Sequence, residues 1–175
     1  ARGRLATTQR LRGKLAAAAA ASTAASASWS EIAAKSNDAE VQRGLGEARV
    51  EAAYIAADQG DVAAALAGLE TGLAELEKQA ASRGTPPPAA LQARMLDRAA
   101  IWTYRLATQQ RDRKLAMQQL ARTADMHGRA AALWTELRAK NPDDTALRSD
   151  AAENALDRAI ALAALQRMPE AKEVL

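Results

Sequence analysis

The chain has 175 residues, of which 49% are hydrophobic and 3% aromatic, and its 24 Lys and Arg against 21 Asp and Glu give a formal net charge of +3. The absence of cysteine excludes disulfides, thiolate nucleophiles and sulfur ligands for a metal. Acidic and basic residues are interleaved along most of the chain. This argues against a nucleic acid partner, because a surface that follows phosphates needs a sustained basic stripe.

Alanine dominates the apolar residues, and the chain contains no Phe. Alanine has the highest helix propensity and allows helices to pack closely, whereas strands favour β-branched and aromatic residues. The length suits one globular or solenoid domain. We therefore expect an all-α fold.

Short segments rich in Gly, Pro, Asn and Asp divide the chain. Asp and Asn supply acceptors for the free N–H groups of a first helical turn, and Pro at an early helical position loses no needed donor. These breaks are Ser36-Asn37-Asp38, Gln59-Gly60-Asp61, Arg83 to Pro88, Gln110-Arg111-Asp112, Asn141 to Asp144, and Gln166 to Pro169. The segments between them predict about seven helices, over residues 3–35, 39–58, 62–82, 88–109, 112–140, 143–165 and 168 onward.

Residues 1–36 form the first segment, which we expect to be one long helix, rich in Ala and Arg, that packs on the first repeat. The stretch from Ala16 to Ala27 is too short and too weakly hydrophobic to span a bilayer, so we expect no direct membrane insertion by this fragment. A homodimer is an alternative use of this helix, because its alanine stripe could pair with a second copy over residues 3–35.

The helix over 112–140 contains His127-Gly128 in its interior, where Gly costs about 1 kcal/mol relative to Ala. A kink or break near Gly128 would be unsurprising, and the sequence leaves the regularity of this helix open.

Two segments of the chain read as copies of one another. Trp29-Ser30-Glu31 is matched by Trp134-Thr135-Glu136, and Glu47, Ala53, Ala57 and Ala65 recur as Glu153, Ala159, Ala163 and Ala171. A long period in an alanine-rich chain indicates stacked helix pairs, which usually build a binding surface rather than an enzyme pocket. Helices joined by short turns lie antiparallel, so we expect repeats over 37–83, 84–140 and 141–175, the last one truncated, with Trp29 and Trp134 as core anchors between hairpins.

The segment Gln59-Gly60-Asp61-Val62-Ala63-Ala64-Ala65-Leu66 resembles the turn and second-helix start of tetratricopeptide repeats. In that family's pattern Ala53 and Ala65 take the small packing positions and Leu69 the large one, while Gln166 replaces the turn glycine in the last unit. The resemblance implies antiparallel helix hairpins stacked as a right-handed solenoid.

More closely, two segments look like the long-helix repeats of large bacterial signalling proteins: Asp38 to Leu45, leading to Gln59-Gly60-Asp61, and Asn141 to Asp144, leading to Arg148-Ser149-Asp150. Such repeats form the C-terminal region of membrane-anchored serine/threonine protein kinases. The resemblance implies a kinase domain elsewhere in the parent protein, a membrane anchor upstream and a periplasmic or extracytoplasmic location. Since the chain begins without Met and stops within an apparent helix, we expect it to be a piece of a larger protein.

Catalytic, metal and cofactor sites are not predicted. His127 is the only histidine, and it lacks a flanking nucleophile motif and His or Cys companions for a metal. Gly44-Leu45-Gly46 does not fit a dinucleotide loop, because no strand precedes it. An enzyme with a site in the Gly84 to Pro88 loop or around His127 is the alternative from another class.

The first helix of each pair lines the concave face of a helix-hairpin solenoid, where ligands are usually peptides or protein segments. By this logic we predict groove-facing residues in all three units: Glu47, Val50, Tyr54, Asp58, Arg98, Ile101, Arg105, Glu153, Leu156, Asp157 and Ile160. Carboxylates on either side of a pair of arginines would hold an extended segment. The alternative is that several of these side chains simply bond to adjacent helices.

The function we expect is a non-catalytic protein–protein interaction or sensor module that binds a protein or peptide partner. A cytoplasmic adaptor or scaffold with no kinase or membrane link is the second hypothesis, and a hydrophobic segment beside this region in the parent gene would distinguish the two.

Overall fold

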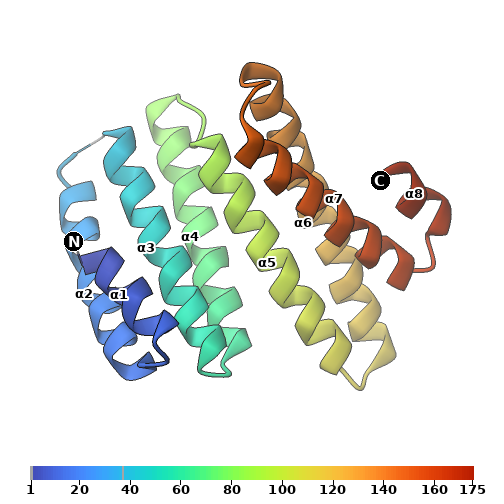
Figure 1. Cartoon of the computed structure of the whole chain (residues 1–175), viewed down its shortest axis with the longest axis horizontal. Helices are drawn as coiled ribbons and strands as arrows, with labels where there is room; N and C mark the ends of the chain where they lie inside the picture. Colours follow the sequence, from blue (N-terminus) through green and yellow to red (C-terminus); the bar gives the residue numbers. More distant parts are fainter. Residues whose placement is uncertain (1, 37) are drawn as a thin grey trace. The chain divides into compact units, whose positions relative to one another are not determined.

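The computed structural model describes residues 2–36 and 38–175 (Figure 1). Over these residues the chain is all-α, as the composition predicts, and contains no strand. Its helices are α1 (Arg2–Leu11), α2 (Leu15–Ala33), α3 (Ala39–Asp58), α4 (Val62–Arg83), α5 (Ala89–Gln109), α6 (Arg113–Lys140), α7 (Thr145–Ala164) and α8 (Met168–Glu173). Among the described residues no helix has the length and apolar character needed to cross a membrane.

The prediction of one helix over residues 3–35 is wrong, because the chain turns back at Gly13 and forms α1 and α2. Gly13 has a φ of 70°, and the amide of Lys14 donates to the carbonyl of Gln9 at 2.9 Å. Glycine adopts this left-handed conformation without the steric penalty of a Cβ, and it commonly ends a helix there. The alanine face that we expected in one long helix is therefore used within the chain, where Ala6 and Ala18 are fully buried with Ile55.

The predicted breaks coincide with helix caps. The side chains of Asp38, Asp61, Asp112 and Asp144 accept from backbone N–H groups in the first turns of α3, α4, α6 and α7. Each supplies an acceptor to donors that the helix itself leaves unpaired. Gly84 ends α4 with a φ of 64°. Local chemistry therefore fixes these boundaries.

The helix α6 runs unbroken through His127-Gly128 to Lys140. Its buried face, which includes His127, Ala130 and Trp134, packs along α7, and tertiary packing of this kind outweighs the low helix propensity of one glycine. A Cβ at position 128 would lie 3.6 Å from Cζ of Arg158, so the guanidinium covers this glycine at ordinary contact distance. The break considered for this helix does not occur.

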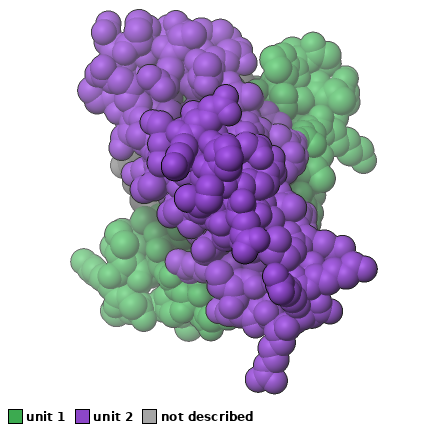
Figure 2. Space-filling model, turned by 90° about the vertical axis from the view of Figure 1, so that its right-hand side faces the viewer, with its two compact units in different colours: residues 1–91 green, residues 92–175 purple. Residues whose placement is uncertain are grey.

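The chain divides into two compact units, residues 1–91 and 92–175 (Figure 2). In the first unit, α1 packs on α2, α2 on α3 and α3 on α4. Two glycines of α3 allow close approach, because a Cβ at Gly44 would lie 2.6 Å from the indole of Trp29 and one at Gly46 would lie 2.3 Å from Cδ2 of Leu91. The Gly44-Leu45-Gly46 segment is thus a helical packing surface.

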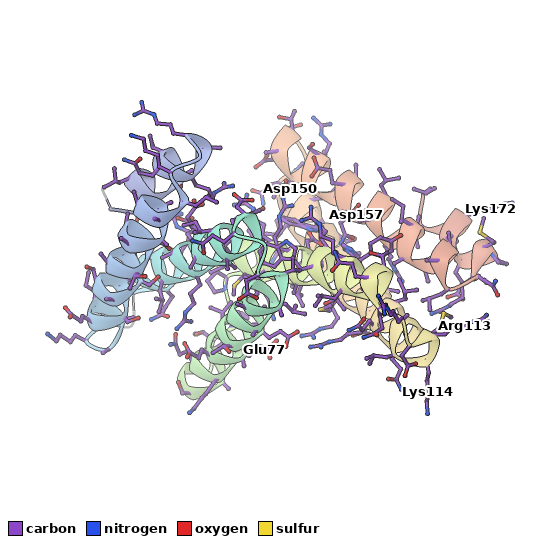
Figure 3. All side chains as sticks on the ribbon, turned by 90° about the horizontal axis from the view of Figure 1, so that it is seen from below. Glu77, Arg113, Lys114, Asp150, Asp157 and Lys172 are labelled. Atoms are coloured by element: carbon purple, nitrogen blue, oxygen red, sulfur yellow. The ribbon has the colours of Figure 1, made fainter. Side chains whose placement is uncertain are left out.

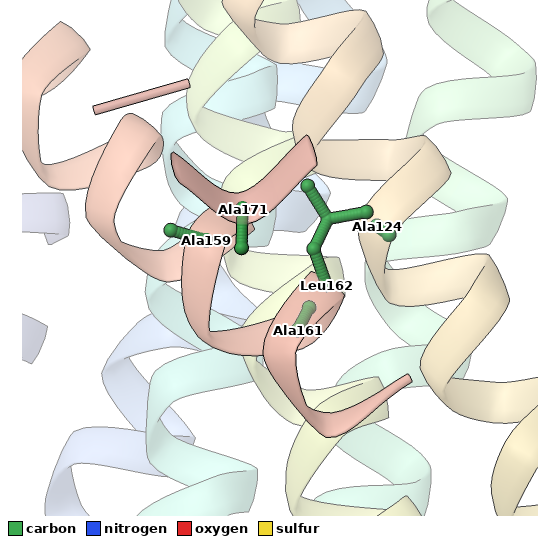
Figure 4. Packing of buried hydrophobic residues seen from close by; sticks show 5 residues of the cluster. All are labelled: Ala124, Ala159, Ala161, Leu162 and Ala171. Atoms are coloured by element: carbon green, nitrogen blue, oxygen red, sulfur yellow. The ribbon is translucent and has the colours of Figure 1, made fainter. Parts of the chain in front are cut away.

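The second unit contains α5 from Gln92 onward, α6, α7 and α8. An alanine-rich cluster joins its last three helices (Figure 4): Ala124, Ala159, Ala161, Leu162 and Ala171. The helix pairs α3–α4, α5–α6 and α7–α8 fall within the spans expected for the three repeats, while α1 and α2 occupy residues 1–36.

Candidate functional site

Asp97 on α5 accepts hydrogen bonds from two other helices of the second unit. The indole Nε1–H of Trp134 on α6 donates to its Oδ2 at 2.8 Å, and Nδ1 of His127 lies 3.2 Å from its Oδ1. The amide Nδ2 of Asn154 on α7 donates to the same Oδ1. One carboxylate therefore holds α5, α6 and α7 together.

Asp97 and the carbonyl of His127 are both acceptors, and they decide the orientation of the Asn154 amide. An ionised carboxylate only accepts, so His127 donates to Asp97 in the tautomer that carries a hydrogen on Nδ1. Nδ2 of Asn154 also donates to the carbonyl of His127 at 3.1 Å. A flipped amide would place an oxygen against both acceptors, so the orientation is set by the network. The 3.2 Å contact between Nδ2 of Asn154 and Nδ1 of His127 is then between two donors.

The three donor residues lie in the core, with exposed fractions of 1% for Trp134, 1% for His127 and 2% for Asn154. Buried polar groups require partners because their desolvation is otherwise uncompensated. Asp97 supplies these partners. The network thus explains His127 as a buried hydrogen-bonding residue of the core.

A pocket of about 60 Å³ lies against this network. Its wall on α5 consists of Arg94, Asp97, Arg98 and Ile101, and its wall on α7 consists of Asp150, Glu153, Asn154 and Asp157. Trp134 of α6 completes the lining. Each helix contributes residues at positions i, i+3, i+4 and i+7, which share one helix face. Figure 3 shows Asp150 and Asp157 along α7.

The two walls run in the same direction. Arg94 pairs with Asp150 across 3.6 Å, and further along both helices Asp97 bonds to Asn154. Figure 1 shows α5 and α7 descending together through the second unit. The repeated spacing on two parallel helices produces a row of charged side chains, the charged strip. It consists of Arg94, Asp97, Arg98, Asp150, Glu153 and Asp157.

Four of the predicted groove residues line this pocket together: Arg98, Ile101, Glu153 and Asp157. Arg105 is exposed on α5, two turns beyond Arg98. Leu156 and Ile160 on α7 are also exposed, at 52% and 43%.

The other four predicted groove residues lie on α3, in the first unit. Arg10 of α1 covers the ring of Tyr54 at 4.9 Å from its centroid, and its Nη1 donates to Oδ2 of Asp58 at 3.2 Å. Glu47 is exposed and lies 3.9 Å from Arg43, and Val50 is half-buried. Tyr54 and Asp58 therefore face α1. This agrees with the alternative prediction that several of the groove residues bond to adjacent helices.

Arg10 also donates through Nε to Oε1 of Glu51 at 2.9 Å. Burial lowers the pKa of Arg10, but the hydrogen bonds and charges of Glu51 and Asp58 outweigh burial, so its pKa is raised above the ordinary value. The guanidinium remains charged and joins α1 to α3. The contacts of Arg10 were not predicted, because one continuous helix over residues 3–35 leaves no turn that returns Arg10 to α3.

Asp97, Asn154, Arg94 and Asp150 were missed as well. A signal for Asn154 existed in the repeat, because the residue after Glu153 is Asn154, whereas the residue after the equivalent Glu47 is Ala48. A polar residue that replaces a core alanine in one copy indicates a local hydrogen-bond partner. That signal does not identify the partner, which lies 57 residues away at Asp97.

Within the part of the chain that the structure describes, no group of three or more His, Cys, Asp or Glu side chains could hold a metal ion. Comparison of the chain with protein-family models, with curated proteins and with solved structures finds no match.

Proposed function

We propose that this chain is a non-catalytic protein–protein interaction module whose binding surface in the second unit is the shared face of α5 and α7. The observation that carries the proposal is the pocket in which Arg98, Ile101, Glu153 and Asp157 meet over the Asp97 network. Such a surface is pre-organised, because the buried hydrogen bonds hold both helices before a partner arrives, and this reduces the entropy lost on binding.

Exposed apolar side chains on α7 support the same proposal. Leu156 and Ile160 are separated by about one helical turn. Leu156 directly precedes Asp157 in the sequence, and Ile160 follows Asp157 by three residues. Large apolar side chains beside charged residues are typical of surfaces that bind protein segments. A partner helix or extended segment could contact the apolar pair and the pocket together.

The wider proposal is a tetratricopeptide-like right-handed solenoid that belongs to a larger bacterial signalling protein, such as a membrane-anchored serine/threonine kinase. It is supported by the copied Trp-x-Glu segments, by three successive helix pairs and by the parallel course of α5 and α7. A cytoplasmic adaptor with the same binding face is the second candidate.

Affinity capture with charge-reversed variants tests the proposed surface. Three forms of the chain serve as bait. They are the wild type, a strip variant with Glu153→Lys and Asp157→Lys, and a matched control with Asp125→Lys and Glu173→Lys. The control changes two exposed carboxylates of the same unit that lie outside the strip. We expect the wild type and the control to retain a partner, identified by mass spectrometry, that the strip variant loses at unchanged circular dichroism. Retention of every partner by the strip variant would refute this surface.

A further inference from the structure

The charge balance of the pocket between α5 and α7 favours a cationic ligand. Two arginines and four carboxylates line it. Asp97 is occupied by its three donors, Arg94 pairs with Asp150, and Arg98 has a partner of its own. Among the described residues Glu153 and Asp157 form no ion pair. The unused charge in the pocket is therefore negative.

Asn154 provides an independent indication of a ligand. Both donor directions of its buried Nδ2 are used, toward Asp97 and toward the carbonyl of His127. Its Oδ1 is buried and has no hydrogen-bond partner within the described part of the chain. A buried acceptor without a partner is unusual in a folded protein, and the side chain that carries it lines the pocket. This unpaired acceptor therefore belongs to a side chain of the pocket wall, beside the carboxylates of Glu153 and Asp157.

The size of the pocket restricts what can enter it. A volume of about 60 Å³ accepts the end of a side chain but not a folded element or a nucleotide. Several acceptors around a small volume match a guanidinium, which carries five N–H donors in a fixed plane. An anionic group would meet the carboxylates of Glu153 and Asp157.

Resting on the proposed function, we propose that the pocket binds the cationic end of an arginine side chain from the partner segment. Glu153 and Asp157 provide the carboxylates, and Oδ1 of Asn154 provides a neutral acceptor. The remainder of the segment lies over Leu156 and Ile160, whose exposure on α7 leaves them free to contact it. Recognition therefore combines one charged anchor with an apolar contact.

Nuclear magnetic resonance of the ¹⁵N-labelled chain tests this assignment with capped glycine tripeptides that carry a central arginine, lysine, citrulline or glutamate. Citrulline keeps the shape of arginine without its charge. We expect the arginine peptide to shift the indole N–H signal of Trp134 and the side-chain amide signal of Asn154 saturably. Citrulline should bind about tenfold or more weakly, as loss of a charge-assisted hydrogen bond predicts, and glutamate should shift neither signal.

Variants complete the test. Asp157→Asn should weaken the arginine peptide about tenfold, whereas Asp125→Asn, an exposed site on α6, should leave its binding unchanged. Equal binding of citrulline and arginine, or absence of saturable shifts, would overturn the assignment. If the strip variant loses its captured partner while the arginine peptide does not bind, the proposed surface stands and the cationic ligand is refuted. If the arginine peptide binds while capture is unaffected, the proposed function fails.

Discussion

The indole N–H of Trp134 donates to Oδ2 of Asp97 at 2.8 Å and joins α6 to α5 within the second unit. Trp134 is 1% exposed, so the bond is protected from water. Because its Oδ1 also accepts hydrogen bonds from His127 and Asn154, Asp97 is the hydrogen-bond acceptor for three buried side chains. The stability of this unit and the shape of its pocket therefore depend on one side chain.

Asp97→Ala should destabilise the second unit by about 3–5 kcal/mol, because the substitution leaves three buried donors without an acceptor. Urea denaturation measures the loss. Asp125→Ala, at an exposed site on α6, is the control and should change stability by about 0.5 kcal/mol or less. Similar effects of the two substitutions would contradict the network.

Trp134→Phe should cost about 1–3 kcal/mol, since it removes the N–H donor and part of a buried ring. A double-mutant cycle with Asp97→Asn isolates the hydrogen bond. We expect a coupling free energy of about 1 kcal/mol or more between the two sites, and additive effects would show that the bond contributes little.

Gly44→Ala should destabilise the first unit by about 1–3 kcal/mol, because the new Cβ would meet the Trp29 indole at 2.6 Å and displace it. Gly68→Ala is a matched control in α4, where a Cβ meets nothing within 4 Å. The control should raise stability by up to about 1 kcal/mol through helix propensity. Thermal denaturation of the two variants measures both changes in stability. Stabilisation by both substitutions would exclude the close contact with Trp29.

Glu170 of α8 should titrate below the usual range for a glutamate. The hydrogen bond from Arg167 lowers the pKa of Glu170, against a weaker opposing effect of burial, and the charges of Arg167 and Arg158 lower it further. A depressed pKa in the folded state means that the contribution to stability is present above the unfolded pKa and is lost as the pH falls through the folded pKa. Carbon-detected NMR titration should show the low value, and Arg167→Ala should raise it. An unchanged pKa in that variant would refute the pairing.

Helix boundaries and helix faces followed from the sequence because their causes are local. Asp61, Asp112 and Asp144 cap helices where the polar breaks were expected, and Gly84 ends α4 in a left-handed conformation. The repeat alignment likewise predicted that Glu153 and Asp157 share one face of the helix that follows Asp144. The tendency of Gly13 to end a helix was underestimated. The helix-forming residues around it predicted one continuous helix, whereas packing of α1 against α2 favours a turn at this residue.

The pairing of faces was decided only in the tertiary structure. Helical periodicity defines which residues share a face, but it does not say which faces meet. Asp97 and Asn154 are 57 residues apart, and Arg10 and Asp58 are 48 apart. Their contacts arise when the helices pack, because a buried carboxylate or guanidinium must find partners among whatever groups the fold brings within reach. For that reason the sequence predicted half of the pocket residues on α5 and α7, namely Arg98, Ile101, Glu153 and Asp157. The fold supplied the Asp97 network that positions them.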